Sequence, residues 1–185
     1  GPIIANGKVI SGRSCRKPDS CVITAHDART GAELWRRRTI PAPGEPGDET
    51  WGDVALEDRR HVGAWMVPSY DPALNLVYWG TGNPVPMFDP EFRPGDNLYS
   101  NSTIALDADT GELKWHFQYT PGDYMDYDEV GIQLLMDVTV DGEERKVLSH
   151  FGRNGIFYTL DRNSGAYIQS AQYVTELNWT EGIDP

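Results

Sequence analysis

Two short segments hold the side chains that could do chemistry. Residues 79–84 read Trp-Gly-Thr-Gly-Asn-Pro and place an amide side chain, Asn83, at the end of a predicted strand. Residues 123–128 read Asp-Tyr-Met-Asp-Tyr-Asp and hold three carboxylates within six positions. Hard cations take oxygen ligands, and a carboxylate near such an ion can also serve as a base. Together the two segments predict a metal-assisted active site.

Each of these residues also has a plainer interpretation. Asn83 precedes Pro84 and could simply end a strand, because residues before proline favour extended conformations. Asp126 and Asp128 could be solvated acids of a loop, and we expect Asp123 to cap the turn. The residue types alone leave these alternatives open.

A hairpin repeat must position the two segments. Residues 25–35 and 105–115 share the pattern Ala-x-Asp-Ala-x-Thr-Gly followed by a closing Trp, and residues 159–165 form a weaker copy without that Trp. Each copy follows a strand-like run and turns at Asp-x-x-Thr/Ser-Gly. The Asp and Thr/Ser side chains can bond turn amides, and Gly supplies a positive φ. The repeat therefore predicts a β-hairpin.

A second type of hairpin precedes each copy of the repeat. These hairpins turn at Asn-Gly, Asp-Pro and Asp-Gly and occupy residues 3–10, 67–78 and 134–148. Two hairpins in succession make a four-stranded antiparallel sheet, and three such sheets in a row are typical of β-propeller blades.

We therefore expect an all-β fold. Residues 1–185 form one partial β-propeller domain, with approximate blades at residues 1–45, 46–120 and 121–175. The closing Trp35 and Trp115 are expected to pack between neighbouring blades. A closed propeller needs at least about four blades, so three predict a piece of a longer protein.

Composition excludes some classes of partner. The formal net charge of -12 argues against nucleic acid binding and would suit cations or a basic protein partner. The chain has no apolar run near the roughly 18 residues of a membrane span, so we do not expect this segment to be transmembrane. Cys15 and Cys21 fit either a disulfide in an oxidising compartment or two unpaired thiols.

The repeat and three further segments together carry a family resemblance. Residues 78–86 (Tyr-Trp-Gly-Thr-Gly-Asn-Pro-Val-Pro), 93–100 (Arg-Pro-Gly-Asp-Asn-Leu-Tyr-Ser) and 115–121 (Trp-His-Phe-Gln-Tyr-Thr-Pro) resemble the quinoprotein alcohol dehydrogenases, whose best-known member is methanol dehydrogenase. The resemblance runs through nearly all of the chain. It implies a fragment of an eight-bladed propeller, located in the periplasm, with pyrroloquinoline quinone (PQQ) and a metal ion near its axis.

The resemblance assigns roles to five residues. Asn83 matches a metal-ligand asparagine, and Asp126 matches the catalytic base beside the metal. Asp128 matches an additional metal-binding carboxylate that looks like a mark of the lanthanide-using branch. Arg153 matches the arginine that contacts the quinone oxygen, and Trp65 the indole on which PQQ stacks. Without the resemblance, Arg153 could pair with nearby acids and Trp65 could be packing between blades.

Some positions depart from the family pattern. The metal-binding glutamate is expected within residues 11–21, which contain no Glu; Asp19 could replace it if that loop folds inward. Gly63 stands where a threonine often bonds the cofactor, and Met125 replaces a tryptophan before the base.

Three functions follow in order of preference. The first is PQQ- and metal-dependent oxidation of a small alcohol, with calcium or a lanthanide as the metal. Electrons would pass to a cytochrome c or a quinone, and we expect this fragment alone to be inactive. The second is a relative that oxidises a bulkier substrate. The third is a non-catalytic propeller scaffold with quinoprotein-like repeats, as found in outer-membrane protein assembly.

Overall fold

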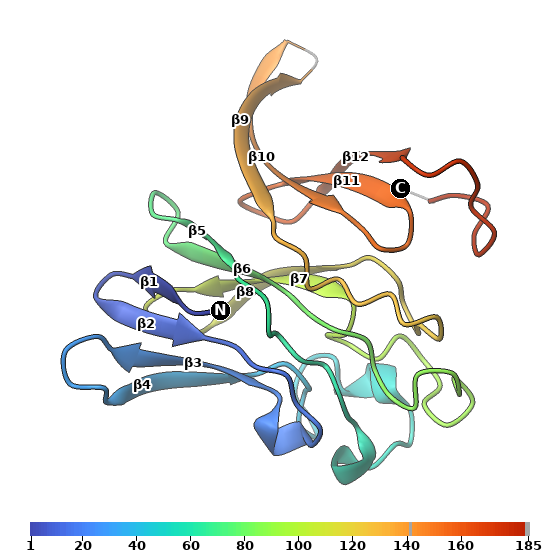
Figure 1. Ribbon diagram of the computed structural model, residues 1–185, viewed down its shortest axis with the longest axis horizontal. Coiled ribbons are helices and arrows are strands. Elements are labelled where there is room, and N and C mark those ends of the chain that lie inside the picture. Colours follow the sequence, from blue (N-terminus) through green and yellow to red (C-terminus); the bar gives the residue numbers. More distant parts are fainter. Residues whose placement is uncertain (141, 184–185) are drawn as a thin grey trace.

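The computed structural model describes residues 1–140 and 142–183, in which three four-stranded antiparallel sheets follow one another (Figure 1). The first sheet contains β1 (Ile3–Ala5), β2 (Lys8–Ser11), β3 (Val22–Asp27) and β4 (Glu33–Arg38). The second contains β5 (Ser69–Asp71), β6 (Leu76–Gly80), β7 (Ser102–Asp107) and β8 (Leu113–Gln118). The third contains β9 (Leu134–Val140), β10 (Glu143–Phe151), β11 (Ile156–Asp161) and β12 (Tyr167–Gln172). The all-β prediction of three four-stranded sheets is confirmed.

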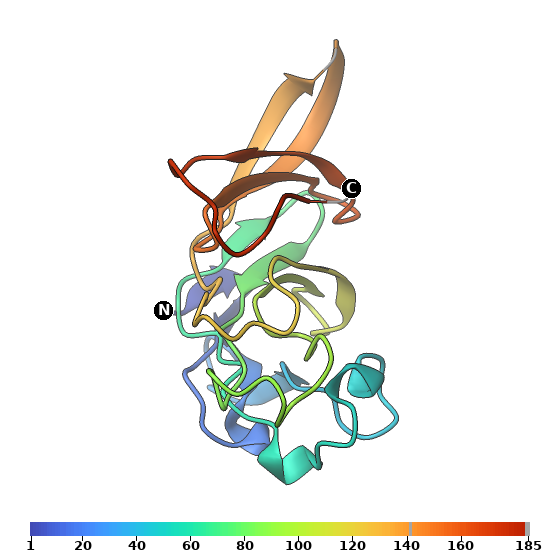
Figure 2. The ribbon, with the colours of Figure 1, turned by 90° about the vertical axis from the view of Figure 1, so that its right-hand side faces the viewer.

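The sheets are stacked in chain order, with the second between the first and the third (Figure 2). Within each sheet, neighbours in space are also neighbours in sequence. Three short 3₁₀ helices lie in the connections, at η1 (Pro18–Ser20), η2 (Asp48–Trp51) and η3 (Leu56–Asp58). No helix among the described residues is long and apolar enough to cross a membrane.

The repeated hairpin turns are held by side chains, as predicted. In the first copy, Asp27 Oδ1 accepts hydrogen bonds from the amides of Arg29 (3.0 Å) and Thr30 (2.7 Å) and from the Thr30 hydroxyl (2.8 Å). Asp107 and Asp161 accept the same three bonds in the second and third copies. The repeat therefore defines the second hairpin of each sheet.

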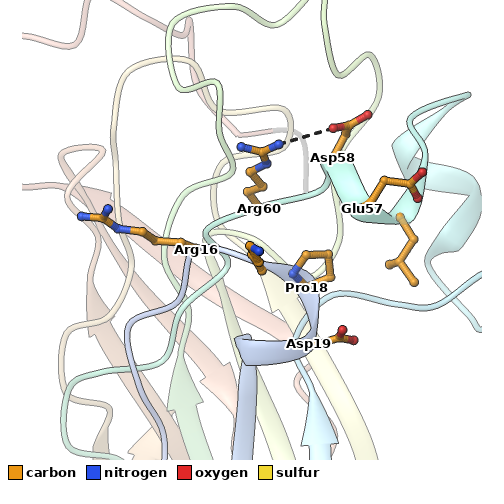
Figure 3. Close-up of a pocket in the computed structure, with 8 residues that line it drawn as sticks. Arg16, Pro18, Asp19, Glu57, Asp58 and Arg60 are labelled. Atoms are coloured by element: carbon orange, nitrogen blue, oxygen red, sulfur yellow. Dashed lines mark hydrogen bonds and ion pairs between the residues drawn. The ribbon is translucent and has the colours of Figure 1, made fainter.

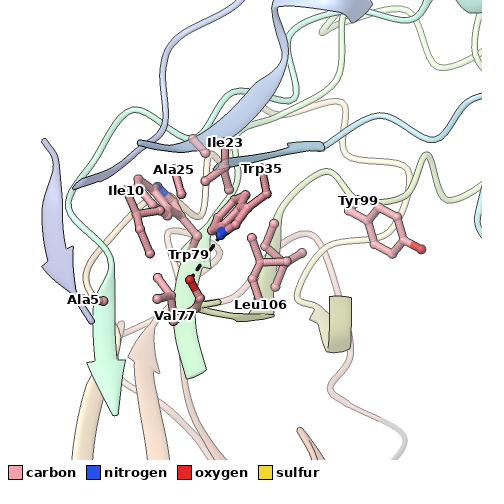
Figure 4. Close-up of a cluster of buried hydrophobic side chains, with 12 residues drawn as sticks. Ala5, Ile10, Ile23, Ala25, Trp35, Val77, Trp79, Tyr99 and Leu106 are labelled. Carbon is pink, nitrogen blue, oxygen red and sulfur yellow. Dashed lines mark hydrogen bonds between the residues drawn. The ribbon is translucent and has the colours of Figure 1, made fainter. Parts of the chain in front are cut away.

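The closing tryptophans pack one sheet against the next, which confirms their predicted role. Trp35 Nε1 donates to the Ala108 carbonyl (3.1 Å; Figure 4), and the indole covers Gly111 in the turn of the second sheet. Trp115 covers Gly165 in the turn of the third sheet in the same way. A side chain at either glycine would collide with the indole, and each glycine also has a positive φ.

The two cysteines form a disulfide, which settles the alternative left by the sequence. Cys15 and Cys21 have Cα atoms 5.0 Å apart. Both are buried with Ile40, Trp51 and Val62 beneath the loop that carries η1. The bridge therefore closes the connection between β2 and β3, and the buried cysteines pack this connection against the long connection between the first two sheets.

Candidate active site

The candidate site lies where the end of the second sheet meets the entry to the third. Asn83 follows β6, Asp128 lies between β8 and β9, and Arg153 follows β10. The Asn83 backbone amide donates to Asp128 Oδ1 (2.8 Å), and Arg153 Nη1 lies 3.5 Å from Asp128 Oδ2. Three of the five predicted residues, far apart in sequence, therefore meet at one carboxylate.

Two glycines permit this close approach. A Cβ on Gly80 would collide with the Glu129 carbonyl, and a Cβ on Gly82 would lie 2.7 Å from Asp128 Oδ1. Between them, the Thr81 carbonyl accepts a hydrogen bond from the Glu129 amide (3.1 Å). The Gly-Thr-Gly run therefore lets the acidic segment lie directly beside the chain that leads to Asn83.

Trp65 forms one wall of the site. A Cβ on Gly82 would also lie 2.7 Å from Trp65 Cζ3, so the indole edge and the Asp128 carboxylate border the same space. The ring is partly exposed. Its segment is held by bonds from the Ala64 amide to the Arg13 carbonyl (2.9 Å) and from the Gly82 amide to the Gly63 carbonyl (2.8 Å).

The space beside Gly63 is limited. A Cβ there would lie 3.0 Å from Trp65 Cε3 and 3.2 Å from the Arg13 carbonyl oxygen. A threonine would require the indole or the Arg13 backbone to shift. The departure from the family pattern at Gly63 therefore matches the way Trp65 is packed.

Asp126 lies in a turn organised by Asp123. Asp123 is buried, and its carboxylate accepts bonds from the amides of Met125 and Tyr127 and from Asn101 Nδ2, each at 2.8 Å. The capping role predicted for Asp123 is confirmed. Asp126 itself is partly exposed and has a φ of 64°, and its charge acts on the carboxyl of Asp128 two residues later.

Asp128 is the electrostatic centre of the cluster. Burial raises the pKa of its carboxyl above the ordinary value of 3.8. The hydrogen bond donated by the Asn83 backbone amide and the positive charge of Arg153 oppose this rise in pKa, whereas the negative charge of Asp126 adds to it. Two neighbouring carboxyls with one guanidinium therefore leave excess negative charge, which suits a cation.

The sequence interpretation missed His61. Its Nδ1 lies 3.1 Å from Asn83 Oδ1 and donates to that oxygen when Nδ1 carries the proton. Its ring centroid is 6.2 Å from that of Trp65. No motif marks His61 in the sequence, because it is a single histidine in an irregular connection.

The expected replacement for the missing glutamate is not found. Asp19 lies on η1 with its side chain 89% exposed, 3.5 Å from Arg38 Nη2. The loop does not fold inward because its disulfide packs the cysteines into the core while Asp19 faces solvent. The described residues contain no group of three or more His, Cys, Asp or Glu side chains that could hold a metal ion.

The residues present nevertheless fit the two implied groups in chemical type. The oxygens of Asn83, Asp126 and Asp128 are hard-cation donors, although fewer than the six or so that calcium takes. The absence of a Cβ at Gly82 lets the Trp65 indole and the Asp128 carboxylate both pack against this position. A flat conjugated molecule would find there an aromatic surface and, at Arg153, a planar cation that is 56% exposed.

A separate cavity lies between the connection of β2 to β3 and the connection of the first sheet to the second. It has a volume of about 640 Å³ and opens between η1 and η3 (Figure 3). Arg16, Lys17 and Asp19 line one side, and Glu57 and Arg60 line the other. None of the five predicted site residues lines this cavity, so it is not part of the candidate site.

A family model and known relatives match this chain. The model described as PQQ, glucose/ethanol/alcohol dehydrogenase β-propeller domain, matches residues 1–174. The quinohemoprotein alcohol dehydrogenase ADH-IIG of Pseudomonas putida is 41% identical over 197 residues, which cover 99% of this chain and 27% of that protein. A putative dehydrogenase XoxF of Paracoccus denitrificans is 52% identical over 130 residues, covering 69% and 22%.

Solved structures agree. The quinohemoprotein alcohol dehydrogenase ADHIIG of Pseudomonas putida HK5 has a TM-score of 0.88 at 38% identity, covering 99% of this chain and 28% of that chain. A europium-containing methanol dehydrogenase has a TM-score of 0.81 at 33% identity, covering 94% and 33%. The chain thus spans about a third or less of the length of these relatives, and it belongs to the PQQ-dependent glucose/ethanol/alcohol dehydrogenase family of β-propellers, as its motifs predicted.

Proposed function

We propose that the protein to which this chain belongs oxidises an alcohol to an aldehyde or ketone, using PQQ and a hard metal ion. The observation that carries the proposal is the meeting of Asn83, Arg153 and Asp128 beside the Trp65 indole. Family membership supports it, since the relatives above are named as alcohol dehydrogenases.

Each residue of the cluster has a distinct part in this proposal. Asp126 accepts the proton of the alcohol hydroxyl, because it is partly exposed and its charge acts on Asp128. Asp128 faces Arg153 with the opposite charge, and Arg153 presents planar donors to an oxygen that gains negative charge. Trp65 supplies a flat surface that orients a conjugated ring system.

The implied groups supply what these side chains lack. PQQ, when bound, accepts the electron pair of the alcohol, and a metal ion acts as a Lewis acid. Asn83, Asp126 and Asp128 would hold that ion. The likeness to a europium-containing enzyme supports a lanthanide, and calcium is the alternative.

The partners and location belong to the same proposal. Electrons pass on to a cytochrome c or a quinone, and the enzyme works in the periplasm. The Cys15–Cys21 disulfide supports an oxidising compartment.

One observation favours a second candidate function, a non-catalytic scaffold. No Glu stands in residues 11–21, and Asp19 faces solvent, so the set of metal ligands is short of one carboxylate. The scaffold would use the propeller surface alone and would require neither Asp126 nor Arg153.

Dye reduction by the full-length protein separates the two functions. The protein is loaded with PQQ plus calcium or lanthanum and assayed with primary alcohols. We expect Asp126→Asn to lower kcat by about 10²–10⁴, the usual contribution of a positioned base. The exposed Asp53→Asn is the matched control and retains the rate. Absence of PQQ binding with either metal would leave the scaffold.

Asp128→Ala tests the choice of metal in the same assay. An added carboxylate raises ligand count and negative charge, which favours a trivalent ion over calcium. We expect the variant to lose mainly the lanthanum-supported rate. Equal loss with both metals would count against a specific lanthanide role for Asp128.

A further inference from the structure

A buried carboxylate and a buried imidazole lie directly behind the candidate site. Glu129 is 0% exposed, and His150 on β10 is 1% exposed. Glu129 Oε2 lies 2.8 Å from His150 Nε2, and the His150 ring packs against Tyr119 with centroids 4.7 Å apart. Burying such a pair is expensive in free energy, so its contacts should reveal what it contributes.

The pair is tied to three segments of the site. The Arg153 backbone amide donates to Glu129 Oε2 (3.1 Å), the same oxygen that faces His150. Glu129 directly follows Asp128, and its own amide donates to Thr81, two residues before Asn83 (3.1 Å). One residue therefore links the segments that carry Asn83, Asp128 and Arg153.

Stability does not explain this pair. Glu129 Oε1 and His150 Nδ1 have no hydrogen-bond partner among the described residues. Unpaired buried polar atoms are destabilising, and apolar side chains of similar volume often replace buried ion pairs without loss. What an apolar pair cannot provide is an acceptor for the Arg153 amide.

Arg153 needs such an anchor. Its side chain is 56% exposed, and its ion pair with Asp128 is 3.5 Å long. The guanidinium end of this pair is exposed to water, which weakens the attraction, so the ion pair alone does not hold the long side chain in one place. The backbone of Arg153 must therefore be fixed from behind.

We propose that Glu129, held by His150, is a positioning residue that fixes Arg153 opposite Asp128. Glu129 acts through the Arg153 backbone and does not itself touch the substrate. The catalytic consequence of this inference rests on the function proposed above, whereas the placement of Arg153 does not.

Two substitutions at Glu129 in the full-length protein separate positioning from packing. Glu129→Met keeps the volume and removes the acceptor, whereas Glu129→Gln keeps an oxygen that both donors can reach. We expect the Met variant to lower kcat and weaken PQQ binding, measured by tryptophan fluorescence quenching, by about tenfold or more. The Gln variant should restore most of both and melt close to wild type, whereas the Met variant leaves His150 and the Arg153 amide unpaired and should melt at a lower temperature, so both are assayed well below their melting temperatures.

Ser149→Ala provides the matched control. Ser149 lies next to His150 on β10, and its hydroxyl makes a buried contact with Thr159 (3.3 Å) but none with Arg153 among the described residues. Loss of this contact should lower the melting temperature and leave kcat and PQQ affinity unchanged. Should the Met variant not fold, Glu129→Met combined with His150→Phe removes both polar groups and is measured in the same way.

The outcomes are distinct. Wild-type kcat and PQQ affinity in a folded Met or Met/Phe variant would overturn the positioning role while leaving the proposed function intact. Failure of the wild-type protein to bind PQQ would overturn the proposed function. In that case crystal structures of the cofactor-free wild-type and Met proteins decide the inference, because it requires the Arg153–Asp128 contact to be lost only in the variant.

Discussion

Asp128 is a residue at which the requirements of stability and of function oppose each other. Its carboxylate is mostly buried, accepts the Asn83 amide and faces Arg153, while Asp126 adds a second negative charge nearby. A residue that is placed in this way destabilises the protein without its cofactors and becomes useful when a cation is present. Such local inconsistencies are expected at functional sites.

The effect of Asp128 on stability should depend on pH. Its folded-state pKa lies above the ordinary value of 3.8, chiefly because of burial, so the folded state favours the protonated form. Stability is therefore lost as pH rises from that value through the folded-state pKa, and it stays lost above it. Asp128→Asn carries no charge to bury, so we expect its melting temperature to exceed that of the wild type by a few degrees at neutral pH.

Thermal melts of the metal-free, cofactor-free protein across this pH range provide the test. Wild type and Asp128→Asn should converge below pH 3.8 and separate as pH rises. Asp53→Asn, at an exposed acid, should follow the wild type throughout. A constant difference between Asp128→Asn and the wild type at every pH would show that burial of this charge is not the cause.

At this scale, family motifs located residues better than chemical reasoning did. Asn83, Asp128 and Arg153 carry recognisable neighbours in sequence, and the structure brings them together. Glu129 stands next to Asp128 without a motif of its own, and its importance depends on contacts with segments distant in sequence. Asp19 could replace the missing glutamate only if its loop folded inward, but the disulfide packing directs it to solvent.

Among the elements, the turn of the hairpin repeat makes the contact between neighbouring sheets, because the Trp of the preceding sheet packs against it. Gly111 has a φ of 73°, and a Cβ there would lie 2.5 Å from Trp35 Cε3. Gly142, in the turn between β9 and β10, has a φ of 83° and nothing within 4 Å of its Cβ position. Both glycines therefore require a positive φ, but only Gly111 is packed against another side chain.

Alanine at these two glycines should separate strain from packing. Gly142→Ala should lose about 1–2 kcal/mol of stability, the price of a left-handed conformation for a residue with a Cβ. Gly111→Ala should lose about 1–3 kcal/mol more, because the methyl group displaces Trp35. Denaturant unfolding of the full-length protein measures the two losses of stability. Equal losses would show that the Trp35 indole moves aside without a cost in free energy.

The disulfide loop is the second element whose contribution can be measured. Cys15 and Cys21 are separated by six positions, so the bridge closes a short loop. Closing a loop of this size lowers the entropy of the unfolded chain, which in the chain-entropy account stabilises the folded state by about 2 kcal/mol. We expect Cys15→Ser with Cys21→Ser to lose about that much stability, with burial of two hydroxyls adding to the loss.

Melting temperatures with and without reductant check this prediction. Reductant should lower the melting temperature of the wild type and leave the double serine variant unchanged. Insensitivity of the wild type under conditions that demonstrably reduce the bridge would contradict a stabilising role.

The strands were predictable because the turns that join them depend on residues close together in the sequence. Asn-Gly, Asp-Gly and Asp-x-x-Thr/Ser-Gly each fix a local conformation, and the hairpins follow from them. The connection of residues 39–68 was not predictable in the same way. Its conformation depends on η2, η3 and the buried Arg59, which donates to the Val54 carbonyl (3.0 Å) and pairs with Asp48 (2.6 Å).

In the molecule as a whole, the sheets are joined one interface at a time, and the two interfaces use different donors. Between the first and second sheets, Trp35 Nε1 donates to the Ala108 carbonyl (3.1 Å). The equivalent carbonyl at the next interface belongs to Arg162, and the Tyr78 hydroxyl donates to it (2.9 Å). Trp115 Nε1 has no partner among the described residues.

This asymmetry predicts unequal effects of matched substitutions in the full-length protein. Trp35→Phe should be less stable than Trp115→Phe by about 1 kcal/mol, because only the former loses a hydrogen bond and leaves a carbonyl unpaired. Tyr78→Phe should show the corresponding loss at the second interface. Trp35→Phe and Tyr78→Phe belong to separate interfaces, so their combined effect should be additive within about 0.5 kcal/mol.

Shifts of the thermal midpoint measure all four variants. A larger loss for Trp115→Phe than for Trp35→Phe would contradict the assignment of the donors. A strongly non-additive double variant would instead mean that the three sheets respond as one body, so that a change at the first interface reaches the cluster around Asp128.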